Sequence, residues 1–348
     1  MKLFITGGTG FLGRSLVKQL APQLKKIYVL VRKGSLARSH KIFKDYANVE
    51  IVCGDITHPN IITDEKKLKE VCTEVESIFH LAGMCDPDAA YRDCLVANVA
   101  GTQNMLSFSG LFKKLRVFHY MSTISVCGNY SGTLKEEELE LGQEFNNHYE
   151  KTKYDAEILV RNWAFSHQIF TRIYRPGILI GVGGPGKEVP KFNDGPYYFF
   201  EILSKLKSKK LLLNTLKYLP LPFDKKSHLP IIPLEDCVDI LSKSILKKQT
   251  GRKIKCYHLL ADDCPTVQEF MQDSFDTFGF SVSVIPLPPS KVNHVIMDKV
   301  GFPKDFSKSM SSQCLFDQEN LKKDFPRLNK TAYHHFKENN FKTVVANF

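Results

Sequence analysis

The chain has 348 residues, of which 43% are hydrophobic, and a formal net charge of +11 at pH 7. This length and composition are typical of a globular protein with one large α/β domain and a smaller lobe. The sequence contains no internal repeat, no low-complexity segment and no run of about eighteen apolar residues, so we expect no membrane-spanning helix. The positive charge is compatible with an anionic membrane surface or phosphorylated ligands, whereas no nucleic-acid-binding motif accompanies it.

The nine cysteines are scattered and form no Cys-x-x-Cys pair. This distribution predicts neither a zinc site nor a disulfide framework, and we expect no metal. Cys53 and Cys127 lie in apolar stretches and are expected to be small core residues. Met1-Lys2 leads directly into an apolar run, which predicts a first strand rather than a signal peptide. A reducing, cytoplasmic location is therefore expected.

The chain opens on a predicted strand, a glycine turn and a helix. Residues 3–5 are apolar and predict a buried strand, and the apolar pattern over residues 11–20 predicts a helix. Gly7, Gly10 and Gly13 lie at three-residue spacing, which permits a tight turn and a close approach to a ligand. The helix N-terminus that follows attracts an anion, and a dinucleotide pyrophosphate is the natural candidate. The alternative is a glycine-rich turn without a ligand, which the strand–turn–helix context disfavours.

A second buried strand over residues 27–31 ends in Arg32 and Lys33. An NAD-binding fold usually carries an acidic residue near this position, where it holds the ribose 2′-hydroxyl. A guanidinium would instead pair with a 2′-phosphate. The sequence therefore predicts that NADP(H) is preferred over NAD(H). The alternative is that Arg32 is only a surface residue at a strand end.

Two further strands are predicted at residues 49–52 and 77–83, with a helix over residues 64–72 between them. Asp55 follows the first of these strands, and it either accepts a hydrogen bond from the adenine amino group or caps the turn. The small residues that end the second of these strands would let a cofactor lie against the backbone. His80 lies within an apolar run and is expected to be a core histidine rather than a catalyst.

The remaining elements of the predicted sheet are longer. We expect helices over residues 91–111 and 149–166, strands over residues 117–121 and 169–174, and a polar, acidic surface loop over the site at residues 129–146. Six strands that alternate with helices predict a doubly wound parallel sheet of the Rossmann type.

The composition changes after about Gly181, where breakers occur at residues 183–186 and 193–196. We expect residues 1–181 to form an NADP-binding Rossmann domain that carries the catalytic residues. Residues 182–348 should form mainly a smaller α+β substrate lobe over the carboxyl edge of the sheet, apart from segments that return to the sheet. In this part we predict helices at residues 197–207, 234–247 and 266–278 and strands at residues 255–260 and 282–286.

Three side chains form a candidate catalytic group. Tyr149 and Lys153 are four residues apart on a predicted helix and so share one face. A lysine ammonium at ~4 Å, in an effective dielectric of ~20, would stabilise a phenolate by about 4 kcal/mol, or ~3 pKa units. This would bring the tyrosine pKa near neutrality, where an acid–base catalyst is effective. Thr123, at the end of the fifth strand, can supply a hydroxyl to the same substrate oxygen.

These motifs resemble those of the extended short-chain dehydrogenase/reductases. Residues 6–13 match the nucleotide motif of that family, Tyr149 and Lys153 match its active-site pair, Thr123 falls at its Ser/Thr position, and residues 98–102 match its Asn-Val-x-Gly-Thr helix. The resemblance implies that Tyr149 transfers the proton, that Lys153 holds the nicotinamide ribose and that the residues after the sixth strand border the nicotinamide. The predicted cofactor-binding residues are Gly7, Gly10, Phe11, Leu12, Gly13, Arg32, Lys33, Asp55, Ile56, Leu81, Ala82, Gly83, Asn98, Lys153, Pro176 and Gly177.

Within this family, residues 29–32, 122–126, 175–181 and 229–236 resemble the thioester reductases and fatty acyl-CoA reductases. This resemblance implies NADP-dependent reduction of an acyl thioester, supplied as an acyl-CoA or by an acyl carrier protein in trans. Aromatic and leucine side chains of the second lobe could line an acyl channel, with the alternative that they are core. These residues are Tyr197, Tyr198, Phe199, Phe200, Leu211, Leu212 and Leu213.

Other functions share the same core motifs. Sugar-nucleotide epimerases or dehydratases and hydroxysteroid or alcohol dehydrogenases are alternatives within the family, and a non-catalytic NADP-binding scaffold is an alternative from another class. The intact group of Tyr149, Lys153 and Thr123 disfavours the scaffold. The resemblance also implies a homodimer through the helices at residues 91–111 and 149–166, and the lysines leave peripheral membrane contact open.

Overall fold

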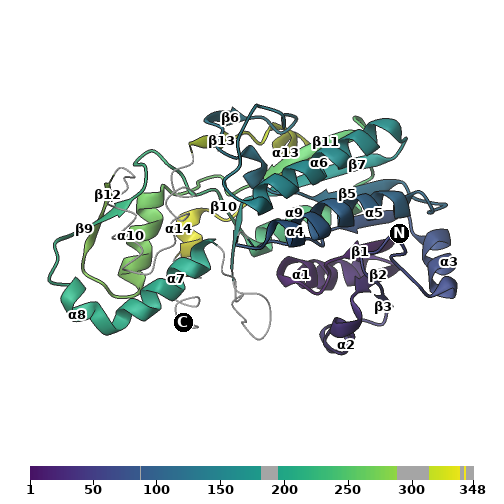
Figure 1. Ribbon diagram of the computed structural model, residues 1–348, viewed down its shortest axis with the longest axis horizontal. Coiled ribbons are helices and arrows are strands. Elements are labelled where there is room, and N and C mark those ends of the chain that lie inside the picture. Colours follow the sequence, from purple (N-terminus) through teal and green to yellow (C-terminus); the bar gives the residue numbers. More distant parts are fainter. Residues whose placement is uncertain (87, 182–194, 288–312, 338–340, 342–348) are drawn as a thin grey trace.

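The computed structural model describes residues 1–86, 88–181, 195–287, 313–337 and 341. The molecule is elongated, with a parallel sheet and its helices at one end and a smaller lobe at the other (Figure 1). The sheet has seven strands in the order β11-β7-β5-β4-β1-β2-β3, and every pairing within it is parallel. Its strands are β1 (Lys2–Thr6), β2 (Lys26–Val31), β3 (Val49–Cys53), β4 (Ser77–His80), β5 (Val117–Met121), β7 (Phe170–Pro176) and β11 (Ile254–Leu259).

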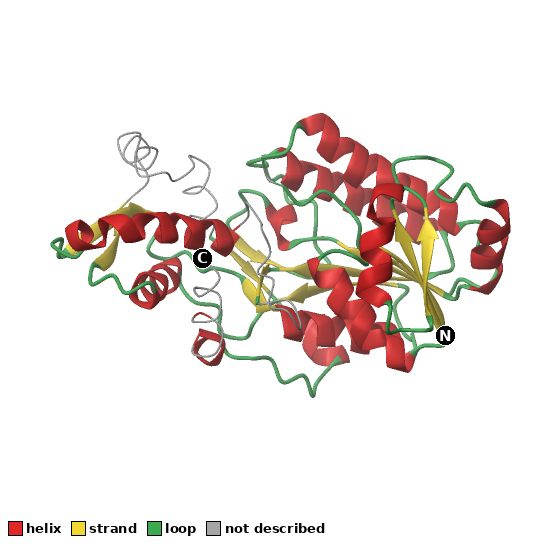
Figure 2. Cartoon of the chain, turned by 90° about the horizontal axis from the view of Figure 1, so that it is seen from below, coloured by secondary structure: helices red, strands yellow, loops and turns green. Residues whose placement is uncertain are grey.

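Helices cover both faces of the sheet (Figure 2). The side chains of α1 (Phe11–Leu20), α2 (Leu36–Phe43) and α9 (Leu234–Leu246) pack on one face. Those of α3 (Glu65–Glu74), α5 (Gly101–Ser109) and α6 (His148–Ser166) pack on the other. Strands that are covered on both faces are apolar along their whole length, which is why the strands of this half could be predicted as continuous apolar runs.

The predicted fold class is confirmed, with one strand more than the six that we expected in the sheet. The strand predicted at residues 255–260 lies in the part of the chain that was expected to form mainly the second lobe, apart from segments that return to the sheet, and β11 is such a segment because it pairs in parallel with β7. The side chains of Cys256, Tyr257 and Leu259 on β11 are buried there. A short apolar run shows that a strand is buried and does not show which strand lies beside it, so the sequence did not identify which segment returns to the sheet.

The helix predicted at residues 91–111 exists, but it is not α-helical throughout. It consists of α4 (Tyr91–Cys94), a π-helical segment (Leu95–Ala100) and α5. Such π segments are rare and often occur at functional sites.

The prediction that residues 129–146 form a polar surface loop is partly wrong. It contains the strand β6 (Gly132–Leu134), which pairs in parallel with β13 (Cys314–Phe316) from the far end of the chain. Leu134, Glu136 and Leu139 are buried. The acidic composition concealed this burial because the partner that covers the segment lies about 180 residues away in the sequence.

The expectation for the two cysteines is right for Cys127, which is buried, and wrong for Cys53, which is exposed. Cys53 is the last residue of β3, and β3 is the edge strand of the sheet, so no neighbouring strand covers that side of it.

The smaller lobe has its own aromatic core. It is built from α7 (Gly195–Leu206), α10 (Val267–Thr277), β9 (Tyr218–Pro222), β12 (Ser283–Leu287) and α14 (Tyr333–Phe336), and β9 and β12 form a parallel pair. A second short pair, β8 (Ile178–Ile180) with β10 (Ile231–Pro233), joins the lobe to the end of the sheet. The remaining elements of the described residues are α8 (Lys210–Leu213), α13 (Glu319–Asp324) and short 3-10 turns at Ala21–Gln23, Lys33–Ser35, Ile124–Cys127 and Lys207–Lys209.

The proposed acyl-channel residues do not behave alike. Phe199 and Phe200 are fully buried and pack against Phe270, so they are core residues, whereas Leu211 is exposed. Leu213 packs against the same core. The side chains of Tyr197, Tyr198 and Leu212, and the breakers at residues 183–186, 193 and 194, lie outside the described part of the chain.

Within the described ranges, no helix is long and apolar enough to cross a membrane. Over the same residues, no group of three or more His, Cys, Asp or Glu side chains is placed to hold a metal ion.

Candidate active site

The glycine turn lies at the carboxyl edge of the sheet, between β1 and α1. Gly7 has a φ of +72°, and a Cβ atom there would lie 2.7 Å from the backbone nitrogen of Ala82. A Cβ atom on Gly13 would lie 2.2 Å from the carbonyl oxygen of Gly7. No L side chain fits at either position, so the two glycines let the turn fold back on α1 and on the chain after β4.

The N-terminus of α1 carries no side-chain cap. Gly10 is its N-cap residue and supplies no side-chain hydrogen bond to the helix amides. The Gly10 N–H itself donates to the Gly7 carbonyl oxygen at 3.1 Å, which holds the turn closed. An uncapped helix N-terminus behind a glycine turn fits a dinucleotide pyrophosphate, as the sequence predicts for Phe11, Leu12 and Gly13.

A buried hydroxyl joins the ends of β1 and β4. The N–H groups of Leu81 and Ala82 donate to Thr6 Oγ1 at 3.2 and 3.0 Å, so the single Thr6 proton is left for His80 Nδ1 at 2.9 Å. His80 Nε2 then donates to Thr102 Oγ1 at 3.2 Å. Burial, with a smaller effect from the Lys153 charge, lowers the His80 pKa to about 3. His80 is therefore a neutral core histidine, as expected.

Arg32 and Lys33 lie at the same edge of the sheet, directly after β2, and both are exposed. β2 is the neighbour of β1, so the structure brings these cations to the glycine-turn side of the sheet. Asp55 follows β3, the next strand along. Asp55 Oδ1 accepts hydrogen bonds from both the N–H and the hydroxyl of Thr57 at 2.9 Å, which is the turn-capping role. A contact of Asp55 with adenine stays a prediction.

Lys153 reaches from α6 to the end of β5. Its Nζ donates to the Met121 carbonyl oxygen at 2.6 Å and to the Tyr120 hydroxyl at 3.2 Å, and it lies 4.7 Å from the centre of the Tyr120 ring. The side chain is buried. The buried Lys153 ammonium is therefore held at the backbone of Met121, the last residue of β5, which lies two residues before Thr123.

Thr123 and Tyr149 complete the predicted catalytic group. Thr123 Oγ1 accepts from the Ser125 N–H and donates to Ser125 Oγ, both at 3.2 Å, at the start of the 3-10 turn that packs on α6. Tyr149 is half-buried in the first turn of α6, one helical turn before Lys153. The structure therefore gathers the three residues at the carboxyl end of β5. Their catalytic roles stay predictions.

Asn98 joins the chain after β4 to the catalytic helix. It is buried in the π-helical segment, and its Oδ1 accepts from the Met84 N–H at 2.7 Å. Its Nδ2 donates to the Met84 carbonyl oxygen at 3.2 Å and to Thr152 Oγ1, the residue before Lys153, at 3.1 Å. These contacts give Asn98 a positioning role beside its predicted contact with the cofactor.

The other predicted cofactor residues lie near the ends of β3 and β4 or at the end of β7. Leu81, Ala82 and Gly83 follow β4, and a Cβ atom on Gly83 would lie 2.8 Å from Asn98 Oδ1. Ile56 is buried in the core beneath this edge.

Pro176 and Gly177 lie at the end of β7, on the far side of the catalytic group from the glycine turn. A Cβ atom on Gly177 would lie 2.4 Å from the carbonyl oxygen of Pro230, so this glycine permits the close approach of the chain that enters the second lobe.

The sequence analysis missed a buried ion pair beneath the catalytic group. Glu157 of α6 and Arg175 of β7 are both fully buried and form two hydrogen bonds, from Arg175 Nε at 3.0 Å and from Nη2 at 2.7 Å. Ser122 Oγ donates to the same carboxylate at 2.5 Å, and Arg161 Nε donates at 2.9 Å. Burial alone would raise the pKa of Glu157, but the two arginine charges and these hydrogen bonds hold it at about 2.

This ion pair connects to the C-terminal part of the chain. Arg175 Nη1 donates to His258 Nε2 at 3.1 Å, so neutral His258 carries its proton on Nδ1 and donates it to the Asp317 carbonyl oxygen at 2.9 Å. Burial and the Arg175 charge lower the His258 pKa to about 3. Glu136 accepts from the backbone N–H groups of His258 and Asn320, and burial raises its pKa to about 7. The one sequence signal for this network was that Glu157 lies four residues after Lys153, which places it on the same face of the helix.

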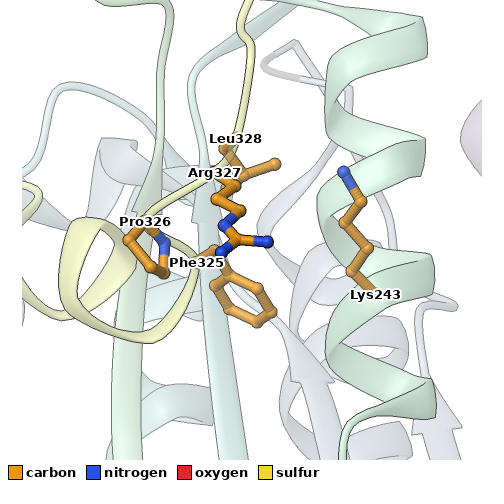
Figure 3. Close-up of a pocket in the computed structure, with 5 residues that line it drawn as sticks. All are labelled: Lys243, Phe325, Pro326, Arg327 and Leu328. Carbon is orange, nitrogen blue, oxygen red and sulfur yellow. The ribbon is translucent and has the colours of Figure 1, made fainter.

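A shallow hollow of about 190 Å³ lies elsewhere, between α9 and the chain after α13. It is lined by Lys243, Phe325, Pro326, Arg327 and Leu328, and the Arg327 guanidinium points toward α9 (Figure 3). None of the predicted catalytic or cofactor-binding residues lines it, and we assign it no function.

Comparison with known proteins identifies the family. Residues 5–239, more than half of the chain, match the NAD-binding model described as male sterility protein. The chain belongs to the male sterility protein family. The matched range includes the glycine turn, Thr123, Tyr149 and Lys153, and it ends within α9.

Several proteins that are similar in sequence to this chain are named as reductases. A putative fatty acyl-CoA reductase of Drosophila melanogaster is 30% identical over 152 residues, which are 39% of this chain and 28% of that protein. The fatty acyl-CoA reductase wat of the same organism is 24% identical over 322 residues, which are 79% of this chain and 60% of that protein. The chain thus matches less than two thirds of the length of these curated relatives.

A solved structure resembles nearly the whole chain. The terminal R domain of the myxalamid PKS-NRPS biosynthetic pathway superposes with a TM-score of 0.73 at 20% identity, and the match covers 99% of this chain and 90% of that domain. At this identity the likeness shows the fold, which is the extended short-chain dehydrogenase/reductase fold that the sequence motifs predicted.

We predict that Glu157→Ala lowers the free energy of unfolding by about 3–5 kcal/mol, because it leaves the buried Arg175 cation without its partner. Asp155→Ala removes the exposed pair with Lys151 on the same helix and should cost less than about 1 kcal/mol. Urea unfolding of the two variants and the wild type measures both values. Similar losses of unfolding free energy in the two variants would show that the buried pair contributes no more to stability than the exposed pair. The double variant Glu157→Leu/Arg175→Met should recover part of the loss, because it removes the fully buried Arg175 charge while Arg161 still loses its Glu157 partner.

Proposed function

We propose that this protein is an NADP-dependent reductase that reduces an acyl thioester. The observation that carries the proposal is the gathering of Thr123, Tyr149 and Lys153 at the carboxyl end of β5, two strands from the glycine turn that follows β1. In an open parallel sheet this edge is where ligands bind.

The residues around the glycine turn fit a nicotinamide dinucleotide. The uncapped amides of α1 would hold the pyrophosphate, Arg32 and Lys33 would pair with a ribose 2′-phosphate, and Lys153 would hold the nicotinamide ribose. When bound, the dinucleotide supplies the hydride for the reduction.

The catalytic side chains act on the oxygen of the substrate carbonyl. As hydride adds to the carbonyl carbon, negative charge develops on this oxygen. The hydroxyls of Thr123 and Tyr149 donate hydrogen bonds to it, and Tyr149 transfers its proton to it. The buried Lys153 ammonium stabilises the phenolate that Tyr149 becomes, because it lies one helical turn away on α6.

The product is determined by the leaving group. The protonated adduct of a thioester is a hemithioacetal, which loses the thiol when its hydroxyl proton is removed and the carbon–sulfur bond breaks. This leaves an aldehyde, and a second hydride and proton would convert it to an alcohol. An ordinary ketone or aldehyde substrate would stop at the alcohol, because it carries no thiol to expel.

Two lines of evidence favour the thioester. Residues 29–32, 122–126 and 229–236 resemble thioester reductases, and the relatives described above are named fatty acyl-CoA reductases. An acyl-CoA and an acyl carrier protein are both candidate donors of the acyl group. Sugar-nucleotide and hydroxysteroid substrates remain the alternatives, because they use the same three catalytic residues.

We predict that the wild-type protein binds NADPH roughly ten- to a hundredfold more tightly than NADH, because the Arg32 guanidinium makes a charge-assisted pair with the 2′-phosphate. Arg32→Ala should weaken NADPH binding and leave NADH binding nearly unchanged. Fluorescence titration of both nucleotides measures the difference. Arg14→Ala, which removes a cation from the first turn of α1 rather than from the end of β2, is the matched control and should retain the preference for NADPH. Equal affinities in the wild type would contradict the predicted cofactor.

We predict that Tyr149→Phe retains NADPH affinity and loses turnover, because only the proton donor is removed. Lys153→Ala should lose both, because the ammonium also contacts the ribose. Nucleotide titration together with steady-state kinetics separates the two effects. Normal turnover of Tyr149→Phe with a verified substrate would overturn the mechanism.

The substrate class is tested with a panel of acyl-CoAs and matched aldehydes and ketones. We expect NADPH oxidation with acyl-CoAs to be accompanied by an equal release of free thiol during reduction to the aldehyde, and by half as much thiol if the alcohol is formed. Absorbance of the nicotinamide and a thiol reagent, followed together, measure the ratio. Oxidation of NADPH by ketones or aldehydes, without any by thioesters, would favour the carbonyl-reductase alternative.

A further inference from the structure

A group of lysines and apolar side chains lies at the end of the smaller lobe. Residues 202–223 contain five lysines and no aspartate or glutamate, and they run from α7 through α8 into β9. We call this region the cationic tip. Its described members are Lys205, Lys207, Lys210, Lys217, Leu211, Leu216 and Tyr218.

The apolar side chains of the cationic tip are exposed. Leu211 is 89% exposed, Leu216 is 43% exposed and Tyr218 is 51% exposed. Single exposed apolar side chains are normal on a protein surface, but these three fall within eight residues and lie among lysines. An apolar group with a cationic rim is the pattern of a surface that inserts into a lipid interface.

The cationic tip is anchored to the lobe. The Ser281 N–H donates to Asn214 Oδ1 at 2.8 Å, and Lys207 Nζ lies 4.9 Å from the centre of the Phe278 ring. Leu213, two residues after Leu211, packs against the lobe core. The exposed side chains are therefore presented by a packed element.

Few acidic groups face the tip. Glu201, in the preceding turn of α7, pairs with Lys205 at 2.8 Å. Asp276 of α10 accepts a hydrogen bond from Gln272 at 2.9 Å. The remaining lysines of the tip have no ion pair among the described residues, so their charge is available to an anionic surface.

We propose that the cationic tip docks onto an anionic lipid membrane. α8 lies at the end of the lobe away from the sheet (Figure 1), whereas Thr123 follows β5 and Tyr149 lies in the first turn of α6 in the other half of the molecule. An acidic carrier protein must bring its thioester to the carboxyl edge of the sheet, so docking at the tip would hold it on the wrong side of the lobe. A membrane that docks at the tip does not have to deliver a thioester to the sheet edge. The lysines would contact the lipid head groups while Leu211 and Leu216 enter the interface.

The test uses the full-length chain and sedimentation with vesicles of phosphatidylcholine alone or with about 30% phosphatidylserine. We expect binding to the anionic vesicles only, and weaker binding at high salt. Lys207→Glu/Lys217→Glu should weaken it at least about twentyfold, because one lysine near an anionic surface contributes about fivefold. Leu211→Ser should weaken it about tenfold through the loss of apolar burial. No turnover is needed, so the result is independent of the proposed reaction.

Matched controls come from the large domain, at the amino end of β5. Lys113→Glu/Lys114→Glu reverses two exposed lysines before β5, and Leu111→Ser removes an exposed leucine after α5. Both should bind vesicles like the wild type, and circular dichroism should show that all variants are folded. Equal losses in the controls, no vesicle binding by the wild type, or equal binding to neutral vesicles would overturn the proposal. It would also be overturned if the wild type bound an acidic acyl carrier protein through the tip and did not bind vesicles.

Discussion

The buried pair of Glu157 and Arg175 connects the parts of the molecule on which the candidate site depends. Glu157 belongs to the helix that carries Tyr149 and Lys153, Arg175 belongs to β7, and Ser122, which donates to the same carboxylate, precedes Thr123. Two charges removed from water require complete hydrogen bonding, because an unmatched group would cost several kcal/mol. The pair therefore favours the relative placement of α6, β5 and β7 in which all of these hydrogen bonds form. That placement brings the predicted catalytic side chains together at one edge of the sheet.

The same edge is organised by close backbone contacts on the cofactor side. Gly7 and Gly13 leave no room for a side chain, and Thr6 joins the ends of β1 and β4 through its one hydroxyl. Asn98 extends this connection from the chain after β4 to Thr152 on α6. The predicted cofactor side and the catalytic side are thus parts of one hydrogen-bonded framework.

The C-terminal part of the chain contributes to the large domain as well as to the lobe. β13 pairs with β6, and Glu136 accepts hydrogen bonds from the backbone of β11 and α13. His258 on β11 contacts Arg175 directly. Segments that are distant in the sequence therefore support the ion pair beneath the catalytic group, while the aromatic core of the lobe stands apart from it.

The sequence by itself determined the elements whose signals are local. Apolar runs predicted β1, β2, β4 and β5, the glycine spacing predicted the turn before α1, and the four-residue spacing of Tyr149 and Lys153 placed them on one helical face. Each of these depends on neighbours within a few residues. The tertiary structure decided the rest: that β11 extends the main sheet, that Glu157 meets Arg175, and that Phe199 is buried while Leu211 is exposed. The physical reason is that burial and pairing are set by partners many residues away, so the same apolar or charged side chain can lie in a core or on a surface.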